Sequence, residues 1–347
     1  MSLLPLLHKV MDRRSLTRDE AHAAFTEIMH GDVPPVHIAA LLAALRVKGE
    51  SVDEITGAAE AMIEASVKVK TDRKPLVDTC GTGGDGKSVF NVSTMAAFVV
   101  AGAGFAVAKH GNRSVSSVCG SADVVEALGI PLESDPKLVE DCLQKVGIAS
   151  LFAPAFHPSM KHAMPVRKEL GTRTIFNLLG PLCNPARPTA QVVGVYDSVW
   201  LKPLAEVLKR LGCEEAYVVH GQGEDEIVLT GTTEVAELHQ GDVRLDSWRP
   251  EDFGFKTQPQ SNETSRTPVE GAQLLLEVLN GRLGFHRNVV CMNAAAAIRA
   301  ALRTKAGGGK TISLKDAVVI AQKSIDSKAA LKKFEALKKA LNPEEDA

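Results

Sequence analysis

A glycine-rich stretch is the most chemically suggestive part of the chain. Residues 81–86 are Gly-Thr-Gly-Gly-Asp-Gly; they follow an apolar run that begins at Pro75 and precede residues 91–94, Asn-Val-Ser-Thr. Glycine loses more backbone entropy than other residues, so this composition does not favour a helix or strand. It lets the backbone adopt positive φ and approach a ligand, and the amides of a following helix would add donors for phosphate. The sequence therefore predicts a site for a phosphorylated substrate.

A plain structural turn, a P-loop and a dinucleotide fold are the alternatives for this stretch. The spacing does not match the G-x-x-x-x-G-K-[ST] pattern of a P-loop. Gly-x-Gly-x-x-Gly does occur, but a dinucleotide fold places an acidic residue about 20 residues further on. The chain has Lys109 and His110 at the end of its next apolar run. Cations there favour a sugar phosphate over a dinucleotide.

The run that begins at Lys109 gathers polar groups of one chemical character. Residues 109–117 contain two cations, an imidazole, an amide and three serine hydroxyls around one glycine. Point charges combined with hydroxyl and amide donors suit a pyrophosphate group. A solvated surface loop is the alternative, but the apolar residues that precede the run favour the end of a buried strand.

Three acids at residues 224–226, Glu-Asp-Glu, follow another apolar run. Clustered acids are most often a solvated turn. At the end of a strand facing a phosphate site, their oxygens can instead hold Mg²⁺ while substrate phosphates complete its shell. His157 and His162 lack zinc-protease spacing, and the nucleophile elbow G-x-S-x-G of serine hydrolases is missing.

These motifs require a parallel sheet to bring them together. The order apolar run, glycine turn, helix and second apolar run over residues 75–113 is that of a βαβ unit, whose ligands bind at the carboxyl ends of the strands. Further strands are predicted at 148–152, 191–196 and 216–220, with an antiparallel addition at 226–229 and 234–238. The predicted fold class is α/β, with a mostly parallel central sheet flanked by helices.

The first 70 residues predict four short helices instead. Thr17 with Glu20 and Ser51 with Glu54 have capping-box spacing, and Gly31 stands where a helix would end. Four such helices form only a small bundle, so a later segment is expected to join them. We predict a small all-helical domain of residues 1–71, joined by about 160–187, and a large α/β domain of residues 72–159 and 188–347.

Composition limits the function classes. A chain of 347 residues has room for two domains, and 45% hydrophobic with 24% charged residues is typical of a globular protein. A net charge of −2 and 4% aromatic residues argue against nucleic-acid binding. The six cysteines form no C-x-x-C pair, the N-terminus does not look like a signal peptide, and the longest apolar stretch is too short to span a bilayer. We expect a cytoplasmic enzyme or binding protein that binds no membrane.

Taken together and in this order, the motifs resemble those of the anthranilate phosphoribosyltransferases of tryptophan biosynthesis, over nearly the whole chain. The segments that carry the resemblance are residues 81–85 (Gly-Thr-Gly-Gly-Asp), 91–94 (Asn-Val-Ser-Thr), 109–117 (Lys-His-Gly-Asn-Arg-Ser-Val-Ser-Ser), 162–167 (His-Ala-Met-Pro-Val-Arg), 177–182 (Asn-Leu-Leu-Gly-Pro-Leu) and 225–226 (Asp-Glu).

The resemblance implies a homodimer through the helical domain, with the nucleoside-phosphorylase type of two-domain architecture and a cleft between the domains. It implies that the 5-phosphoribosyl group passes from 5-phosphoribosyl 1-diphosphate to the amine of anthranilate, with release of pyrophosphate and with Mg²⁺ as cofactor. By this analogy the residues that contact phosphoribosyl diphosphate are Gly81, Gly84, Asp85, Val89, Asn91, Ser93, Thr94, Lys109, Asn112, Arg113, Ser116, Ser117 and Ser121. Those that meet anthranilate are Gly81, Asn112 and Arg167, and those that hold the metal are Ser93, Asp225 and Glu226.

One position departs from the family pattern, and three carry the expected chemistry. Val89 stands where the family often has Ser or Thr, so a contact to the 5-phosphate is lost or is supplied by Ser88. Arg167 would hold the anthranilate carboxylate, and Lys109 would stabilise the departing pyrophosphate. His110 is the candidate acceptor of the amine proton, and no covalent intermediate is expected.

Two rival functions share the fold. A pyrimidine nucleoside phosphorylase is expected to have a Lys-His-Ser phosphate motif where this chain has Asp78-Thr79-Cys80. A non-catalytic nucleic-acid-binding relative would need a basic face, which the net charge does not indicate.

Overall fold

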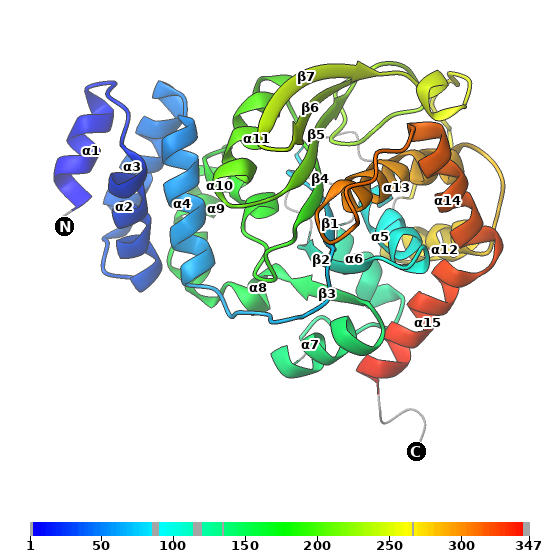
Figure 1. The fold of residues 1–347 in the computed structure, drawn as a ribbon. Helices are drawn as coiled ribbons and strands as arrows, with labels where there is room; N and C mark the ends of the chain where they lie inside the picture. Colours follow the sequence, from blue (N-terminus) through cyan, green and yellow to red (C-terminus); the bar gives the residue numbers. More distant parts are fainter. Residues whose placement is uncertain (1–2, 85–89, 114–119, 134, 266, 343–347) are drawn as a thin grey trace.

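A layer of four helices begins the chain. The computed structural model describes residues 3–84, 90–113, 120–133, 135–265 and 267–342. The four helices are α1 (Leu3–Met11), α2 (Arg18–His30), α3 (Pro35–Lys48) and α4 (Val52–Glu64). Figure 1 shows them in blue on one side of the part that contains the sheet. The prediction of four short helices over the first 70 residues is confirmed.

Local signals define where α2 and α4 begin. The side chain of Thr17 accepts a hydrogen bond from the Glu20 amide while the Glu20 carboxylate accepts one from the Thr17 amide, and Ser51 with Glu54 repeats this arrangement. Each box satisfies donors that the first turn leaves unpaired. Gly31 ends α2 with φ of 86°, a conformation that glycine adopts at little cost. Both predicted capping boxes are therefore confirmed.

The second part of the chain is built on one seven-stranded sheet. Its strands are β1 (Leu76–Gly81), β2 (Ala106–Gly111), β3 (Ile148–Phe152), β4 (Ala190–Gly194), β5 (Glu215–Gly221), β6 (Thr233–His239) and β7 (Asp242–Trp248), in the spatial order β3-β2-β1-β4-β5-β6-β7. Strands β1 to β5 run parallel to one another, β6 is antiparallel to β5, and β7 is antiparallel to β6. The predicted mostly parallel sheet is confirmed. Since β2 and β4 lie on opposite sides of β1, the chain reverses direction across the sheet at β1, where α/β folds bind ligands.

The predicted antiparallel addition is correct in kind but wrong in its first strand. Residues 226–229 do not join the sheet; the backbone of Ile227 is held by the side chain of Asn293, which accepts from its amide at 3.1 Å and donates to its carbonyl at 2.9 Å. The addition consists of β6 and β7. β7 is mostly exposed, so its sequence has little of the apolar alternation by which strands are recognised.

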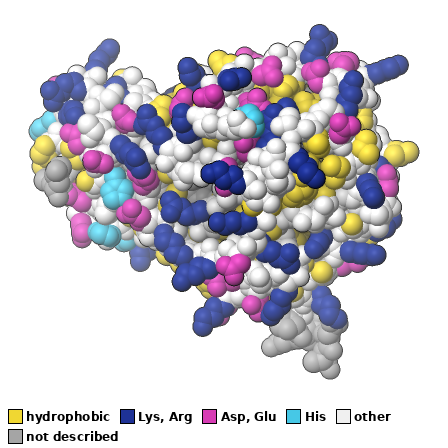
Figure 2. All heavy atoms as spheres, in the orientation of Figure 1, with side chains coloured by type: hydrophobic (Ala, Val, Ile, Leu, Met, Phe, Trp, Pro, Cys, Tyr) yellow, Lys and Arg dark blue, Asp and Glu magenta, His cyan; other side chains and the backbone are white. Residues whose placement is uncertain are grey.

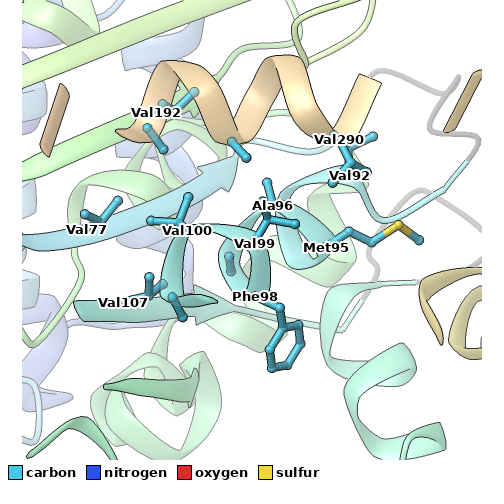
Figure 3. Packing of buried hydrophobic residues seen from close by; sticks show 14 of the residues in the cluster. Val77, Val92, Met95, Ala96, Phe98, Val99, Val100, Val107, Val192 and Val290 are labelled. Carbon is cyan, nitrogen blue, oxygen red and sulfur yellow. The ribbon is translucent and has the colours of Figure 1, made fainter. Parts of the chain in front are cut away.

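Two hydrophobic cores cover the two faces of the sheet. Val192 belongs to one core and Val193 to the other, as expected for a strand with side chains alternating between faces. On the first face, α5 (Val92–Gly102) packs against β1 and against α13 (Phe285–Arg303). Figure 3 shows Val77 of β1 and Val107 of β2 beside residues of α5, while Val192 of β4 lies near α13. The other core continues from the sheet through α11 (Leu201–Arg210) into the first four helices.

Short helical pieces carry the chain back to the first helices after β3. They are α8 (Ala153–Phe156), η1 (Pro158–His162), α9 (Met164–Leu170), α10 (Phe176–Leu179) and η2 (Gly180–Leu182). η1 contacts α2, α9 contacts α3, and α10 contacts α4. The domain boundaries at residues 71, 159 and 187 stay predictions.

The remaining helices surround the sheet-containing part. They are α6 (Ser121–Ala127), α7 (Pro136–Lys145), α12 (Pro268–Leu279), α14 (Leu314–Asp326) and α15 (Ala329–Leu341), and short 3-10 turns lie at Ser198–Trp200 and Pro250–Phe253. Lys and Arg side chains are spread over the face in Figure 2, with Asp and Glu among them. Across the described ranges, no helix combines the length and apolar character needed to span a membrane.

Candidate active site

The carboxyl ends of β1, β2, β4 and β5 bring the predicted polar motifs to one edge of the sheet. The glycine turn follows β1, the Lys109 segment ends β2, and the Asp225 segment follows β5. The Thr82 amide donates to the Gly194 carbonyl at 2.9 Å, which joins the turn to the end of β4. Residues scattered along the sequence therefore lie together at this edge of the sheet.

Asp225 reaches directly into the glycine turn. Its Oδ2 accepts a hydrogen bond from the Gly83 amide at 2.8 Å, and the residue is only 6% exposed. A Cβ at Gly81 would lie 2.2 Å from this same oxygen, and one at Gly194 would lie 1.5 Å from the Asp225 carbonyl oxygen. Such distances are far below van der Waals contact. The approach of the acidic segment thus requires glycine on two neighbouring strands.

A network of buried polar residues on β1 and β2 lies next to the glycine turn. The Lys109 ammonium donates to the Thr79 carbonyl at 2.7 Å, and the fully buried Asp78 accepts from the His110 amide at 3.2 Å and from the Asn184 side chain at 2.8 Å. Burial raises the pKa of Asp78, although the Lys109 charge and these hydrogen bonds act in the opposite direction. An ammonium has three donors, so Lys109 keeps donor capacity beyond the bond to Thr79.

His110 is held as a neutral ring. Burial lowers its pKa to about 3, with the neighbouring His157 ring contributing in the same direction. Its Nδ1 lies 3.1 Å from the Gly180 carbonyl oxygen. A carbonyl only accepts, so Nδ1 carries the proton and Nε2 is an acceptor. Nε2 has no partner within the described part of the chain.

The N-terminus of α5 adds donors and hydroxyls beside the turn. The Thr79 hydroxyl donates to the Ser93 carbonyl at 2.8 Å, which attaches this helix end to β1. First-turn amides have no partner inside a helix and favour negative charge. The hydroxyl of Thr94 is buried and makes no hydrogen bond with any described residue. This end of α5 therefore suits an anion.

Arg167 presents its guanidinium next to an aromatic ring. It lies 5.2 Å from the Phe176 ring centroid, and its Nη1 donates a long hydrogen bond of 3.6 Å to the Met164 sulfur. It forms no ion pair with an acid in the described residues. Burial lowers the pKa of Arg167, which nevertheless remains charged. A partly buried guanidinium of this kind suits a carboxylate ligand.

The segment that contains Asn112 and Arg113 contacts α6 in this structure. Arg113 is exposed and its guanidinium donates to Asp123 at 2.7 Å and to Glu126 at 2.9 Å, both on α6. These acids raise the pKa of Arg113 and already engage its charge. Ser121 donates to the Asn112 carbonyl at 3.2 Å. The predicted phosphate contacts of Asn112, Arg113 and Ser121 stay predictions.

The donor set fits a magnesium ion shared with a substrate. Among the described residues no group of three His, Cys, Asp or Glu side chains converges to hold a metal by itself. Mg²⁺ is usually held by one or two carboxylates, with phosphates and waters completing the octahedron. Asp225 and Glu226 supply carboxylates beside the glycine turn, so their oxygen chemistry suits that ion.

Comparison with known proteins gives the family. Residues 73–331 match the glycosyl transferase family a/b domain, and residues 4–66 match the helical bundle domain of the same family. The chain is 49% identical to the anthranilate phosphoribosyltransferase of Symbiobacterium thermophilum over 334 residues, 96% of each chain. The enzyme of that name from Anaeromyxobacter sp. is also 49% identical, with 95% of this chain and 96% of the relative covered. The chain belongs to the anthranilate phosphoribosyltransferase family.

Solved structures agree with the family in fold. The anthranilate phosphoribosyltransferase of Thermus thermophilus superimposes with a TM-score of 0.90 at 43% identity, with 97% of this chain and 99% of that chain covered. The Saccharomyces cerevisiae enzyme, solved in complex with phosphoribosyl diphosphate and magnesium, gives 0.87 at 28% identity, with 98% of each chain covered. The predicted family and fold class are confirmed, and the chain is an enzyme of the glycosyltransferase class.

Several predicted site residues lie outside the described residues. These are Asp85, Val89, Ser116 and Ser117, together with Ser88, the alternative to Val89 as a 5-phosphate contact. Of the others, the structure brings Gly81, Gly84, Asn91, Ser93, Thr94, Lys109, His110, Asp225 and Glu226 to the carboxyl edge of the sheet or the adjoining end of α5. Arg167 lies on α9, which packs on the helical layer. All individual roles stay predictions.

Two side chains, Asn184 and Arg173, link the segments around the glycine turn by hydrogen bonds and were not identified from the sequence. Asn184 connects Asp78 to the Ala108 carbonyl, with both bonds at 2.8 Å, and Arg173 donates to the Gly84 carbonyl. Neither residue lies in a glycine turn or at the end of a predicted strand. Gly194 had a usable signal, because a glycine that ends a strand often permits close approach of another backbone.

Proposed function

We propose that the protein transfers the 5-phosphoribosyl group of 5-phosphoribosyl 1-diphosphate to the amine of anthranilate and releases pyrophosphate. The hydrogen bond between Asp225 and the Gly83 amide carries the proposal, because it joins the carboxylates needed for a metal to a turn suited to phosphate. The names of the relatives support the same reaction. Structures of the Saccharomyces cerevisiae enzyme support the substrates, since one is a complex with phosphoribosyl diphosphate and magnesium and another a complex with 4-fluoroanthranilate.

The glycine turn and the end of α5 would bind the diphosphate. Backbone donors fixed before the reaction stabilise charge that develops on the departing pyrophosphate. Lys109 is buried beside the turn and adds a positive charge there. Departure of pyrophosphate leaves positive character on the ribose anomeric carbon, and the nitrogen of anthranilate attacks that carbon. No protein nucleophile is needed.

Asp225, Glu226 and Ser93 would hold Mg²⁺ together with the substrate phosphates. The ion supplies Lewis-acid stabilisation of the diphosphate. Asp225 has a second role that does not depend on the metal, since it fixes the Gly83 amide.

Arg167 would bind and orient anthranilate through its carboxylate. The guanidinium is planar and forms two parallel hydrogen bonds with a carboxylate. An aromatic amine is unprotonated at neutral pH, so orientation matters more than deprotonation before attack. Positioning can lower a barrier by ~7–11 kcal/mol at most.

His110 would act through Nε2 as a hydrogen-bond acceptor. A ring with a pKa of about 3 is a weak base at neutral pH. Our prediction that it accepts the amine proton stays a prediction. The alternative is that His110 orients the amine while substrate oxygen or water takes the proton.

The proposal extends to a homodimer formed by the helical layer. Leu4 and Met11 on α1 are 41% and 63% exposed, and Val36 and Val47 on α3 are 69% and 79% exposed. α1 and α3 pack side by side, so these apolar side chains belong to neighbouring helices. Exposed apolar residues grouped in this way favour a protein interface. We also propose a division at residues 71, 159 and 187, with the substrates between the two domains.

A cytoplasmic location completes the proposal. The cysteines of the described residues, Cys80, Cys142, Cys183, Cys213 and Cys291, are free thiols. Free buried thiols favour a reducing compartment.

Loss of anthranilate fluorescence tests the function directly. The purified protein is expected to consume anthranilate only when phosphoribosyl diphosphate and Mg²⁺ are both present, with one pyrophosphate released per anthranilate. Unchanged fluorescence together with phosphate-dependent cleavage of a pyrimidine nucleoside would instead favour the phosphorylase.

A further inference from the structure

Arg173 connects two strand ends at the candidate active site. It lies in the exposed segment between α9 and α10. Its guanidinium donates a hydrogen bond to the carbonyl of Gly84, in the turn that follows β1. The same guanidinium lies 4.2 Å from the ring centroid of Tyr196, just after β4. The side chain of Arg173 therefore contacts the residues that follow two neighbouring strands, β1 and β4.

Two side chains form hydrogen bonds with the backbone of the glycine turn, one as acceptor and one as donor. Gly83 and Gly84 have φ of 64° and 80°, and open space surrounds the Cβ position of Gly83. The Asp225 carboxylate accepts from the Gly83 amide, while Arg173 donates to the Gly84 carbonyl. A hydrogen bond to the Gly84 carbonyl limits the rotation of the Gly84 backbone. Two glycines that could otherwise adopt many conformations are thereby restricted.

Tyr196 explains why an exposed arginine can perform this task. A guanidinium over an aromatic face gains ~0.5–1 kcal/mol at an exposed site, and stacking limits the positions its donors can take. The backbone at Tyr196 is itself attached to the turn, because its amide donates to the Thr82 hydroxyl at 3.1 Å. Arg46 and Glu50, from the end of α3 and the loop after it, also act electrostatically on Tyr196.

We propose that Arg173, stacked on Tyr196, is a positioning residue that holds the Gly84 carbonyl, and with it the backbone of Gly84, in the conformation that binds the diphosphate of phosphoribosyl diphosphate. The proposal rests on the function proposed above. In this proposal the shape of the guanidinium matters more than its positive charge. Solvent screens an exposed charge, whereas an ammonium cannot reproduce the stacking and the hydrogen bond of a planar guanidinium.

Binding of phosphoribosyl diphosphate to the whole protein, by titration calorimetry with Mg²⁺ present, tests this role. Loss of one stacked hydrogen bond to the turn is expected to weaken binding about tenfold in Arg173→Ala. The KM for phosphoribosyl diphosphate should rise by a similar factor, with less than about a twofold change in the KM for anthranilate. Arg173→Lys should not restore binding. Arg244→Ala is the matched control, because this exposed arginine pairs with Asp242 on the edge strand β7, which β4, β5 and β6 separate from β1 and its turn.

A double-mutant cycle with Tyr196→Ala distinguishes the stacked pair from two independent effects. If the ring acts by placing the guanidinium, Tyr196→Ala weakens binding as Arg173→Ala does, and the double variant is no worse than either single one. Additive losses, wild-type affinity in Arg173→Ala, restoration by Arg173→Lys, or equal weakening of both substrates would each overturn the proposal. Failure of the wild-type protein to bind phosphoribosyl diphosphate would instead refute the function.

Discussion

The side chain of Asp225 accepts a hydrogen bond from the amide of Gly83 at 2.8 Å, although the two residues are 142 positions apart in the chain. The contact brings the acidic segment after β5 to the glycine turn after β1. Neither segment alone defines a site, since acids of this kind are often solvated and glycine turns are often structural. Their contact supports the proposal that both belong to one site.

Enlarging Gly81 should separate these two segments. In Gly81→Ala the new methyl group would lie 2.2 Å from Asp225 Oδ2, so the carboxylate must move. Misplacement of a group by about 1 Å can cost on the order of 100-fold in rate, and we expect a loss of kcat/KM of that size. Steady-state kinetics at several Mg²⁺ concentrations measures it. Wild-type kinetics in this variant would show that the position of Asp225 is unimportant.

Removal of the two carboxylate charges should change the response to magnesium. Asp225→Asn combined with Glu226→Gln keeps the shape of both side chains but weakens their hold on a cation. A bound metal supplies several kcal/mol of stabilisation, so activity at fixed Mg²⁺ should fall by at least about 100-fold. Magnesium titrations of activity provide the measurement. An unchanged titration curve would return the segment to the solvated-turn interpretation.

Arg167 should act on one substrate and not on the other. Hydrogen bonds between charged groups contribute about 1.5–3 kcal/mol, so Arg167→Ala is expected to raise the KM for anthranilate roughly 10- to 100-fold. Arg167→Lys keeps the charge but not the planar fork and should recover only part of the loss. The KM for phosphoribosyl diphosphate serves as the internal control. Equal weakening of both substrates would contradict the assignment.

Acid should destabilise the fold through two buried histidines. Burial lowers the pKa of His110 to about 3 and that of His157 to about 4, and their ring centroids are 5.2 Å apart. Below pH 6.5 the unfolded chain takes up protons that these folded rings do not. Stability therefore falls as the pH decreases, by about 2 kcal/mol per histidine between pH 7 and pH 5.

Chemical denaturation of the wild-type protein and His157→Gln at these two pH values checks that expectation. The variant lacks one of the two groups, so its unfolding free energy should depend less steeply on pH, whatever its stability at pH 7. An identical pH dependence in both proteins would show that His157 does not titrate differently on folding.

The oligomeric state should depend on the exposed apolar residues of the helical layer. Val36→Glu combined with Val47→Glu places charges where two copies are proposed to meet, and burying unpaired charge is costly. We expect monomers by sedimentation or light scattering. Val319→Glu, at a valine on α14 that is 62% exposed, controls for the added charge. A dimer that survives the double change, or a monomeric wild-type protein, would argue against this interface.

The sequence by itself determined the first four helices, the parallel strands and the polar residues at the ends of those strands. Capping boxes define the starts of α2 and α4, and the apolar runs that end at Gly81 and Gly111 predict parallel strands with polar carboxyl ends. β7 escaped prediction because most of its side chains are exposed, and the interval 226–229 is apolar because it packs under α13 without joining the sheet. A run of apolar residues indicates that a segment is buried. It does not show whether the buried segment is a strand or a loop.

Only the tertiary structure decided which distant groups meet. The Asp225 contact with Gly83, the Arg173 contact with Gly84 and the bond from Asn184 to Asp78 each join segments separated by another strand or helix. No periodicity encodes such pairs, because they depend on strand order and on how closely two backbones approach. Gly81 and Gly194 permit that approach at the end of β1 and β4, where any Cβ would collide with Asp225.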